Sequence, residues 1–253
     1  MKRIAHAVAA PVLAMALVGS ALPAAAFSDS EKKEMGEIIR QYLIENPEVL
    51  LEVQDAYQKK MDDQRNQQAK SVLNGQKELI FNSPVDIVMG NPQGKIEIVE
   101  FFDYNCGYCK QNLSVMQDIL DKNNDVRFIL KEWPVLGPDS DAAHKVSDAV
   151  HKIAPDKSAP FFLKVMGGRG RANEEKAIEA AVSLGIDEAK LRETMKTNPN
   201  TETQQATHVL AMQLGFNGTP AYIIGDELLP GAYGLDAFNT KIANLRSCGK
   251  ATC

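Results

Sequence analysis

Two cysteines separated by two residues, Cys106 and Cys109, follow an apolar run at 96–102 that is rich in β-branched and aromatic side chains. Such a run predicts a buried strand. Asn105 is a favoured helix N-cap residue, so a helix is expected to begin at Cys106. The free N–H groups of a helix N-terminus favour a thiolate over a thiol. A strand that leads directly into a helix carrying a dithiol therefore favours an α/β fold built around reactive cysteines.

The remainder of the chain after about residue 82 supports the α/β class. A strand, a helix and a second strand follow one another within about 35 residues, which predicts a parallel pair joined by a right-handed crossover. Residues from about 140 to 195 form a predicted helical insertion, after which the sheet resumes. The expected strands lie at 85–89, 95–102, 126–130 and 221–224, and the expected helices of this core at 106–121 and 235–245.

The first 26 residues have the pattern of a cleavable signal peptide. Lys2 and Arg3 precede an apolar stretch that reaches about Leu22, and Ala24 to Ala26 supply the small residues of a cleavage site. A membrane anchor is the less favoured alternative because the apolar run is short, and no later segment is apolar for long enough to insert. The periplasm is the simplest destination, although full secretion stays open. An exported chain meets an oxidising environment, which suits disulfide chemistry.

Charge argues against a nucleic-acid partner. The chain carries a formal net charge of −5, and losing Lys2 and Arg3 with the signal peptide would make it more negative. No basic patch suited to nucleic acid or to an anionic membrane stands out in the sequence.

Residues 27–81 are predicted to be helical and to form an N-terminal segment. Met35, Ile38, Ile39 and Tyr42 recur at helical spacing. Asn46-Pro47-Glu48 predicts the start of a second helix, with Asn46 as its N-cap and Pro47 at its first helical position. A polar stretch at 62–68 follows. These short amphipathic helices need a partner for their apolar stripe. They could fold back on the main domain, but the polar spacer favours assembly with copies of the same chain into a homo-oligomer.

The Cys-Gly-Tyr-Cys sequence at 106–109 predicts thiol–disulfide exchange. Cys106, in the first helical turn, is the expected attacking thiolate, and Cys109, one turn further, is the expected resolving thiol. A purely structural disulfide is less favoured because its short loop restricts little chain entropy. A zinc site that adds Cys248 and Cys253 is less favoured because their Cys-x4-Cys spacing is loose for zinc. No metal and no cofactor are therefore expected.

Residues 100–109, Glu-Phe-Phe-Asp-Tyr-Asn-Cys-Gly-Tyr-Cys, with Gly218-Thr219-Pro220 far downstream, resemble the thioredoxin superfamily. The closer resemblance is to its DsbA-like branch, which carries a helical insertion. Closer still are the oligomeric periplasmic isomerases of the ScsC type (suppressor of copper sensitivity C), whose helical N-terminal segment assembles the subunits. The resemblance implies a thioredoxin fold with a helical insertion domain, preceded by an oligomerisation segment. The implied division is 1–26, 27–81 and 82–253.

The resemblance also implies roles for residues around the dithiol. Thr219-Pro220 would be a cis-proline loop that faces the cysteines and offers its backbone to an extended substrate. Gly107 and Tyr108 would influence the redox potential. Glu100 would lie beneath the site and assist proton transfer, although alternation with Ile98 leaves an outward-facing position open. A pairing of Glu100 with Lys131 is a further hypothesis.

Cys248 and Cys253 end the chain as Cys-Gly-Lys-Ala-Thr-Cys, which allows a local disulfide. A structural clip after the last helix is the favoured interpretation. A second redox pair, an intermolecular bridge and free thiols stay open.

Together these patterns predict a periplasmic thiol–disulfide oxidoreductase, and favour a protein disulfide isomerase. Its expected partners are misoxidised or reduced exported proteins, a membrane redox protein that keeps the dithiol reduced, and further copies of itself. One alternative is a DsbA-like oxidase that introduces disulfides, because the motif alone does not set the direction. Alternatives of other classes are a periplasmic copper-binding protein that uses Cys106 and Cys109 as soft ligands, and a non-catalytic chaperone scaffold.

Overall fold

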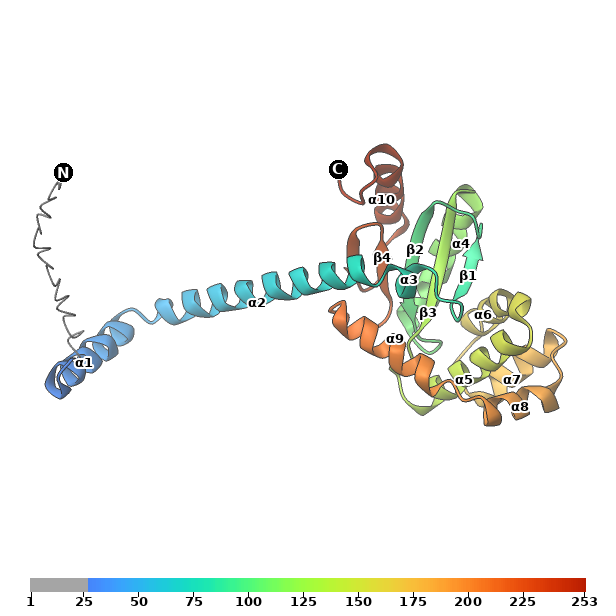
Figure 1. Ribbon diagram of the computed structural model, residues 1–253, viewed down its shortest axis with the longest axis horizontal. Coiled ribbons are helices and arrows are strands. Elements are labelled where there is room, and N and C mark those ends of the chain that lie inside the picture. Colours follow the sequence, from blue (N-terminus) through green and yellow to red (C-terminus); the bar gives the residue numbers. More distant parts are fainter. Residues whose placement is uncertain (1–26) are drawn as a thin grey trace, which may run out of the picture. The chain divides into compact units, whose positions relative to one another are not determined.

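The computed structural model describes residues 27–253, so the expected signal peptide at 1–26 lies outside the described residues (Figure 1). Within the described range, none of the helices combines the length and the apolar character that a membrane crossing requires. The chain divides into two compact units, one ending at Gln58 and one comprising Lys59–Cys253. This boundary falls inside a continuous helix, and the sequence-based division at residue 81 stays a prediction.

Helix α1 (Asp29–Glu45) opens the first unit with a capping box. The Glu31 N–H donates to Ser28 Oγ at 3.3 Å, and the Ser28 N–H donates back to Glu31 Oε2 at 2.7 Å. The helix ends at Asn46, whose backbone N–H and side-chain Nδ2 both donate to the Tyr42 carbonyl. The expectation that Asn46 caps the start of the next helix is therefore wrong. Its amide donors instead satisfy a free carbonyl at the end of α1.

The apolar stripes of this unit are exposed in the single chain. Helix α1 has no buried residue, and α2 (Glu48–Gly75) buries only Ala69 and Leu73, which belong to the second unit. The polar stretch at 62–68 continues as part of α2. Large exposed apolar side chains extend along α1 and the first turns of α2: Met35, Ile38, Ile39, Tyr42, Ile44, Leu50, Leu51, Val53 and Tyr57.

A five-stranded mixed sheet forms the centre of the second unit, in the order β1-β3-β2-β4-β5. Strands β2 and β3 are parallel and are joined through helix α4 (Gly107–Lys122), while the other neighbouring pairs are antiparallel. The strand bounds are Ile87–Gly90 (β1), Ile96–Phe102 (β2), Val126–Glu132 (β3), Ala221–Ile224 (β4) and Glu227–Pro230 (β5). The sequence did not indicate β5, which follows a tight turn at Gly225 with φ of +60°.

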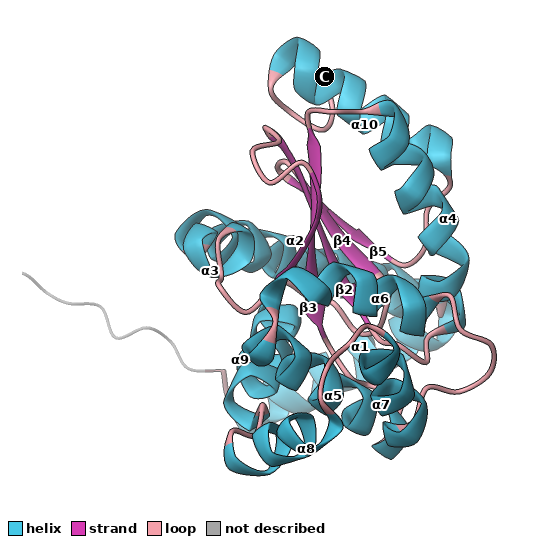
Figure 2. Cartoon of the chain, turned by 90° about the vertical axis from the view of Figure 1, so that its right-hand side faces the viewer, coloured by secondary structure: helices cyan, strands magenta, loops and turns pink. Residues whose placement is uncertain are grey.

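Helices cover both faces of this sheet (Figure 2). Ile98 and Phe102 of β2 join the core cluster beneath α4 and α10 (Leu235–Cys248). The alternate residues Val99 and Phe101 join the cluster beneath α3 (Lys77–Phe81) and α9 (Thr201–Gln213). Burial of each such side chain stabilises the fold by roughly 1.5–3 kcal/mol. The period-two alternation of β2 therefore decides which of its side chains can lie under α4.

A helical insertion follows β3, as expected, and consists of α5 (Pro138–Ile153), a short 3-10 turn (Pro155–Lys157), α6 (Ser158–Met166), α7 (Glu174–Ser183) and α8 (Glu188–Thr197). Phe162 of α6 packs edge-to-face on Phe102 at the end of β2, with ring centroids 5.0 Å apart. The insertion is thereby fixed to the strand end that leads into the cysteine motif. The predicted α/β class with a helical insertion is confirmed.

Candidate active site

The loop between β2 and α4 is held by one buried carboxylate. Asp103 is fully buried and accepts hydrogen bonds from the Asn105 N–H at 2.7 Å and from Ser140 Oγ at 2.7 Å. Its second oxygen accepts from the N–H groups of Val135 and Leu136 at 2.8 and 3.0 Å. Sequence reasoning assigned Asp103 no role, although an Asp directly after a strand is a recognisable turn former. It orients the chain that carries the dithiol.

Helix α4 begins one residue later than the sequence suggested. Cys106 itself occupies the N-cap position, with extended backbone angles, and Gly107 is the first helical residue. Asn105 does not cap the helix because its side-chain amide is engaged elsewhere. Its Nδ2 donates to the Ala172 carbonyl at 2.9 Å, and its Oδ1 accepts from the Ala172 N–H at 2.7 Å. The Cys106 sulfur is thus placed at the end of the helix where backbone N–H groups are free.

Cys106 and Cys109 are both free thiols and both buried. A hydrogen bond from Cys109 lowers the pKa of Cys106 to about 6, assisted by Thr219 and by backbone N–H groups of α4, against an opposing effect of burial. Burial raises the pKa of Cys109 far above its ordinary value, and the proximity of Cys106 and of the Glu100 carboxylate adds to this shift. At neutral pH the pair therefore consists of one thiolate and one thiol that donates to it.

The Thr219-Pro220 peptide is cis and lies against the first cysteine. Cys106 Sγ lies 3.1 Å from the Thr219 carbonyl oxygen. The Pro220 carbonyl accepts from the Gly231 N–H at 2.9 Å, which ties this loop to the end of β5. Proline has no N–H of its own, so Pro220 brings no backbone donor to the thiols. The cis loop is one wall of the site.

Glu100 is buried on the β2 face that α4 covers, not outward in solvent. It accepts a hydrogen bond from Tyr222 Oη at 3.2 Å, and Asn112 of α4 donates to the same hydroxyl at 3.1 Å. Burial raises the pKa of Glu100 to about 8, against the opposing effect of the Tyr222 hydrogen bond. Sequence reasoning missed Tyr222 and Asn112. Their only signal is that Tyr222 follows the Thr-Pro pair by two residues and Asn112 lies one turn beyond Cys109.

The pairing of Glu100 with Lys131 is wrong. In the parallel register Glu100 is opposite Leu130, so Lys131 projects from the other face of the sheet. There Lys131 Nζ donates to Asp86 at 2.6 Å and to the Leu79 carbonyl at 2.6 Å. Burial raises the pKa of Asp86 to about 6 and lowers that of Lys131. This buried pair belongs to the other face of the sheet and does not reach the dithiol.

The two residues between the cysteines are the least constrained part of the site. A side chain at Gly107 would meet no heavy atom within 4 Å, and the Tyr108 ring is 64% exposed. Their effect on the redox potential stays a prediction.

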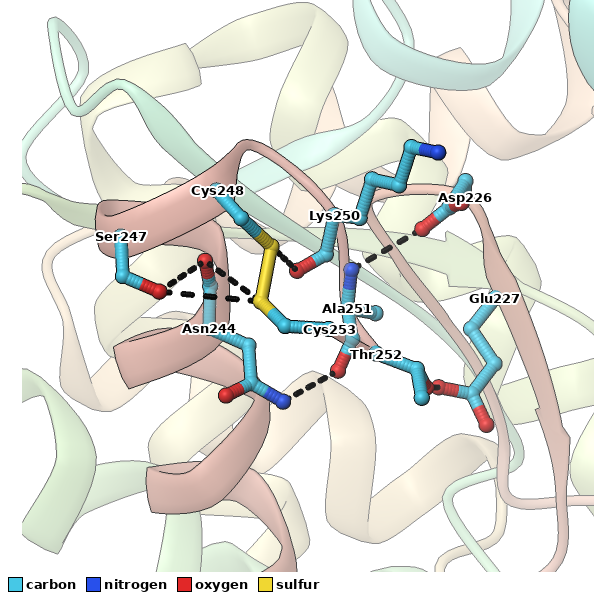
Figure 3. The surroundings of a disulfide bond; sticks show 9 residues. All are labelled: Asp226, Glu227, Asn244, Ser247, Cys248, Lys250, Ala251, Thr252 and Cys253. Carbon is cyan, nitrogen blue, oxygen red and sulfur yellow. Dashed lines mark hydrogen bonds between the residues drawn. A yellow bond between two sulfur atoms is a disulfide. The ribbon is translucent and has the colours of Figure 1, made fainter.

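The two remaining cysteines, Cys248 and Cys253, form a disulfide with each other just beyond α10 (Figure 3). Asn244 Nδ2 donates to the Ala251 carbonyl at 3.0 Å, and the Ala251 N–H donates to Asp226 at 2.9 Å, so the closing loop is also hydrogen-bonded to the body. A four-cysteine zinc site is incompatible with this bond. Among residues 27–253, no group of three or more His, Cys, Asp and Glu side chains is arranged to hold a metal ion.

Fold and site together define a thioredoxin-fold protein with a dithiol at a helix N-terminus and a cis-proline loop opposite it. A family model described as DSBA-like thioredoxin domain matches residues 97–243, and the chain belongs to this family. A second model, described as copper resistance protein ScsC N-terminal domain, matches residues 31–64. Both resemblances expected from the sequence are thus confirmed.

Known proteins show the same two-part similarity. The thiol:disulfide interchange protein DsbA of Bordetella parapertussis is 30% identical over 143 residues, which make up 54% of this chain and 66% of that protein's length. A solved thioredoxin-like oxidoreductase from Silicibacter pomeroyi is 34% identical with a TM-score of 0.63, covering 68% of this chain and 98% of its own. Proteus mirabilis ScsC, solved in a transitional conformation, is 29% identical with a TM-score of 0.61, covering 85% and 94%.

Proposed function

We propose that this chain is a periplasmic thiol–disulfide oxidoreductase that acts as a protein disulfide isomerase. The observation that carries the proposal is the placement of two free cysteines: Cys106 is the N-cap residue of α4 and lies 3.1 Å from the Thr219 carbonyl of the cis loop, and Cys109 is buried in the first turn. This setting lowers the pKa of Cys106 to about 6 and raises that of Cys109. A low-pKa thiol is a thiolate at neutral pH, and only the thiolate attacks a disulfide. Family membership and the cis-proline loop support the same activity.

The reaction begins when the Cys106 thiolate attacks one sulfur of a client disulfide. A bond forms between Cys106 Sγ and that sulfur, and the second client sulfur leaves as a thiolate with the electron pair of the broken bond. In isomerisation a client thiolate then attacks the mixed disulfide and releases Cys106, so no electrons are gained or lost overall. In the alternative resolution, Cys109 loses its proton and attacks Cys106 Sγ, which releases a reduced client and leaves a Cys106–Cys109 disulfide.

Neighbouring residues have defined roles in this scheme. The Thr219 backbone pairs with the extended client segment beside Cys106, and Pro220 keeps a competing N–H away from the sulfur. The ionised form of Glu100 accepts the proton that Cys109 loses during resolution. With a pKa of about 8 the carboxyl is mostly protonated at neutral pH, so this step uses its smaller ionised fraction and becomes more available as pH rises toward 8.

The isomerase direction rests on the N-terminal segment. The exposed apolar side chains of α1 and early α2 would be covered if copies of the chain associate, and residues 31–64 match the ScsC N-terminal family. An assembly with several dithiols can hold a misoxidised exported client and exclude a bulky oxidant. The dithiol must stay reduced for this work, so a membrane redox partner supplies electrons. The sequence-predicted signal peptide at 1–26 supports export to the periplasm.

Reactivation of scrambled ribonuclease tests the proposal. The reduced protein should restore nuclease activity at a rate well above that of a Cys106→Ser variant, which lacks the attacking sulfur. Cys109→Ala should retain part of the activity, because isomerisation needs only Cys106. Reactivation no faster than with Cys106→Ser would refute the isomerase. If the oxidised protein instead converts reduced ribonuclease to the active form far faster than it reshuffles the scrambled form, the oxidase alternative gains.

A copper-binding role is a second candidate because the matching N-terminal family is described as copper resistance. Cys106 and Cys109 are free and adjacent, and paired thiolates are ligands that Cu(I) accepts. The burial of Cys109 disfavours ionisation of the second ligand. Titration of the reduced protein with Cu(I) against a competing chelator distinguishes the roles. Tight stoichiometric binding that Cys109→Ser abolishes, without any reactivation of ribonuclease, would favour copper binding.

A further inference from the structure

A small pocket with an unusual concentration of positive charge lies beside the cysteine motif. It encloses about 200 Å³ between α4, the loop at 167–173 that follows α6, and α7. Lys110, one of its walls, directly follows Cys109 in the chain. Ala172, at another wall, exchanges two hydrogen bonds with Asn105, which directly precedes Cys106. We call it the cationic pocket, after its basic lining residues Lys110, Lys164, Arg169, Arg171 and Lys176.

The charges of the cationic pocket are largely uncompensated. Within residues 27–253, Lys164 and Arg169 form no salt bridge, whereas Arg171 pairs with Asp139 at 2.8 Å. Glu179 is the one carboxylate in the lining, and the described structure contains no salt bridge between it and these cations. The chain as a whole has a net charge of −5, so this cluster opposes the overall sign. An excess of one charge in a concave site attracts ligands of the other charge.

Backbone carbonyls, not carboxylates, hold two of the lysines of the cationic pocket. Lys110 Nζ donates to the carbonyls of Gly168 and Gly170 at 3.0 and 3.2 Å, and Lys176 Nζ donates to the Arg169 carbonyl at 3.4 Å. Gly170 has φ of +74°, which directs this loop so that its carbonyls reach Lys110. Burial, and then the charge of Lys176, lower the pKa of Lys110. The ammonium groups of Lys110 and Lys176 are positioned by neutral backbone carbonyls, so their positive charge remains available to a ligand.

We propose that the cationic pocket binds an acidic side chain of the client polypeptide, close in sequence to the cysteine that reacts with Cys106. The inference rests on the proposed exchange function and adds a substrate preference to it. A client segment held by Thr219 passes the Cys106 sulfur, and the pocket wall begins at the residues that adjoin each cysteine. An Asp or Glu carboxylate there is attracted by Lys164 and Arg169, which form no salt bridge within residues 27–253, and gains charge-assisted hydrogen bonds from the oriented ammonium groups of Lys110 and Lys176. Clients with acidic residues beside the cysteine are thus preferred over clients with basic ones.

Three peptides test this preference. Each has a single cysteine, and they differ only at one nearby position, which is Glu, Gln or Lys. In the first measurement the cysteine is replaced by serine, and binding of each labelled peptide to the full chain is followed by fluorescence anisotropy at low salt. In the second, each peptide carries its cysteine as a mixed disulfide, and the rate constant of its release by the reduced protein is measured. We expect the Glu peptide to exceed the Lys peptide about tenfold in both, with the difference shrinking at high salt.

The variant Lys164→Gln with Arg169→Gln should reduce the ratio of the Glu peptide to the Gln peptide toward one. Lys190→Gln with Lys196→Gln is the matched control, because it removes two exposed charges of α8 that do not line the pocket, and it should retain the ratio. Equal binding of the Glu and Gln peptides by the unmodified protein would refute the proposal that the pocket binds an acidic side chain. So would an equal decrease of the Glu-to-Gln ratio in the control variant. Preferential binding of the Glu peptide without release of any mixed disulfide supports the pocket and refutes the exchange function.

Discussion

Cys109 controls the reactivity of Cys106 through a single proton. The largest cause of the lowered Cys106 pKa is the hydrogen bond from Cys109, not the helix N-terminus alone. We therefore expect Cys106 of the reduced protein to titrate near pH 6, with attack on a disulfide falling about tenfold per pH unit below that point. Cys109→Ala should raise the Cys106 pKa clearly, whereas Cys109→Ser, which keeps a hydroxyl donor, should raise it less.

Absorbance of the thiolate in the ultraviolet measures this titration directly. Because the pKa of Cys109 is raised, the change below about pH 8 in the reduced protein reports Cys106 alone. A midpoint close to that of an ordinary cysteine would contradict the assigned hydrogen bond. So would equal midpoints for the alanine and serine variants at position 109.

Glu100 makes the stability of the fold depend on pH. Its pKa is raised from 4.5 to about 8, so between these values the folded chain holds a proton that the unfolded chain releases. The free energy of unfolding contributed by this group therefore decreases as pH rises through that interval, by at most about 1.4 kcal/mol per pH unit. Glu100→Gln removes this dependence. The free energy of unfolding of the variant minus that of the wild type should therefore be larger at pH 8 than at pH 5.

Urea denaturation of both proteins in the reduced state at the two pH values measures the difference. Glu193→Gln, on the exposed face of α8, is the matched control and should leave the pH dependence of the wild type intact. A stability gap between wild type and Glu100→Gln that does not widen with pH would mean that the carboxyl is already ionised at low pH.

Only some residues of the active site could be predicted from the sequence. The dithiol was recognisable because two cysteines at fixed spacing after a strand form a local pattern. The partners that give Glu100 and Asp103 their environment, Tyr222 and Ser140, lie far away in the chain and carry no local signal. The predicted pairing of Glu100 with Lys131 was wrong because two polar side chains at the same end of neighbouring strands need not lie on the same face of the sheet. The register of β2 and β3 decides on which face each side chain lies.

At the scale of elements, helix α10 ends in the disulfide between Cys248 and Cys253. The bond closes a loop over a sequence separation of 5, so loop-closure entropy predicts a stabilisation of about 2 kcal/mol. We expect Cys248→Ser with Cys253→Ser to lower the free energy of unfolding by no more than this amount, measured by urea denaturation without reductant. Release of a peptide from its mixed disulfide should proceed at the wild-type rate, because this loop contributes no group to the cysteine motif.

A large loss of exchange activity in this double variant would contradict a structural clip and favour a second redox pair. The clip is placed at the C-terminal end of a helix, where carbonyls and not N–H groups are free. This position offers a thiolate no stabilisation, unlike the position of Cys106.

Most elements of the second unit could be predicted, and the exceptions share a physical cause. Long periodic segments such as β2, α4 and α5 follow from their own side chains. Strand β5 is only four residues long and forms because β4 offers it an edge, so its pattern alone does not distinguish it from a loop. The helix starts near Asn46 and Asn105 were misassigned because an Asn side chain can satisfy several kinds of partner, and tertiary contacts chose among them.

At the scale of the whole molecule, the chain up to Gln58 is a separate unit, and its described residues 27–58 include no buried side chain in the single chain. The amphipathic stripe was evident from the spacing of Met35, Ile38, Ile39 and Tyr42. The spacing of apolar residues shows that one face of a helix is apolar, but it does not show which surface covers that face. The proposed answer, another copy of the chain, therefore needs a direct measurement.

Ile39→Glu places a charge in the middle of the α1 stripe, where Ile39 is 56% exposed in the single chain. If copies bury this face against one another, the substitution loses roughly 1.5–3 kcal/mol of apolar burial per subunit and adds the cost of a buried charge. We expect multi-angle light scattering to give a multiple of the subunit mass for the wild type and the subunit mass for Ile39→Glu.

Arg40→Glu, about a quarter-turn further round α1 and outside the stripe, is the control and should keep the assembly. Ile39→Glu should still release short peptides from mixed disulfides at the wild-type rate, yet reactivate scrambled ribonuclease more slowly, because only the second task uses several dithiols around one client. A wild-type mass equal to one subunit, or an unchanged mass for Ile39→Glu, would remove the basis for choosing an isomerase over an oxidase.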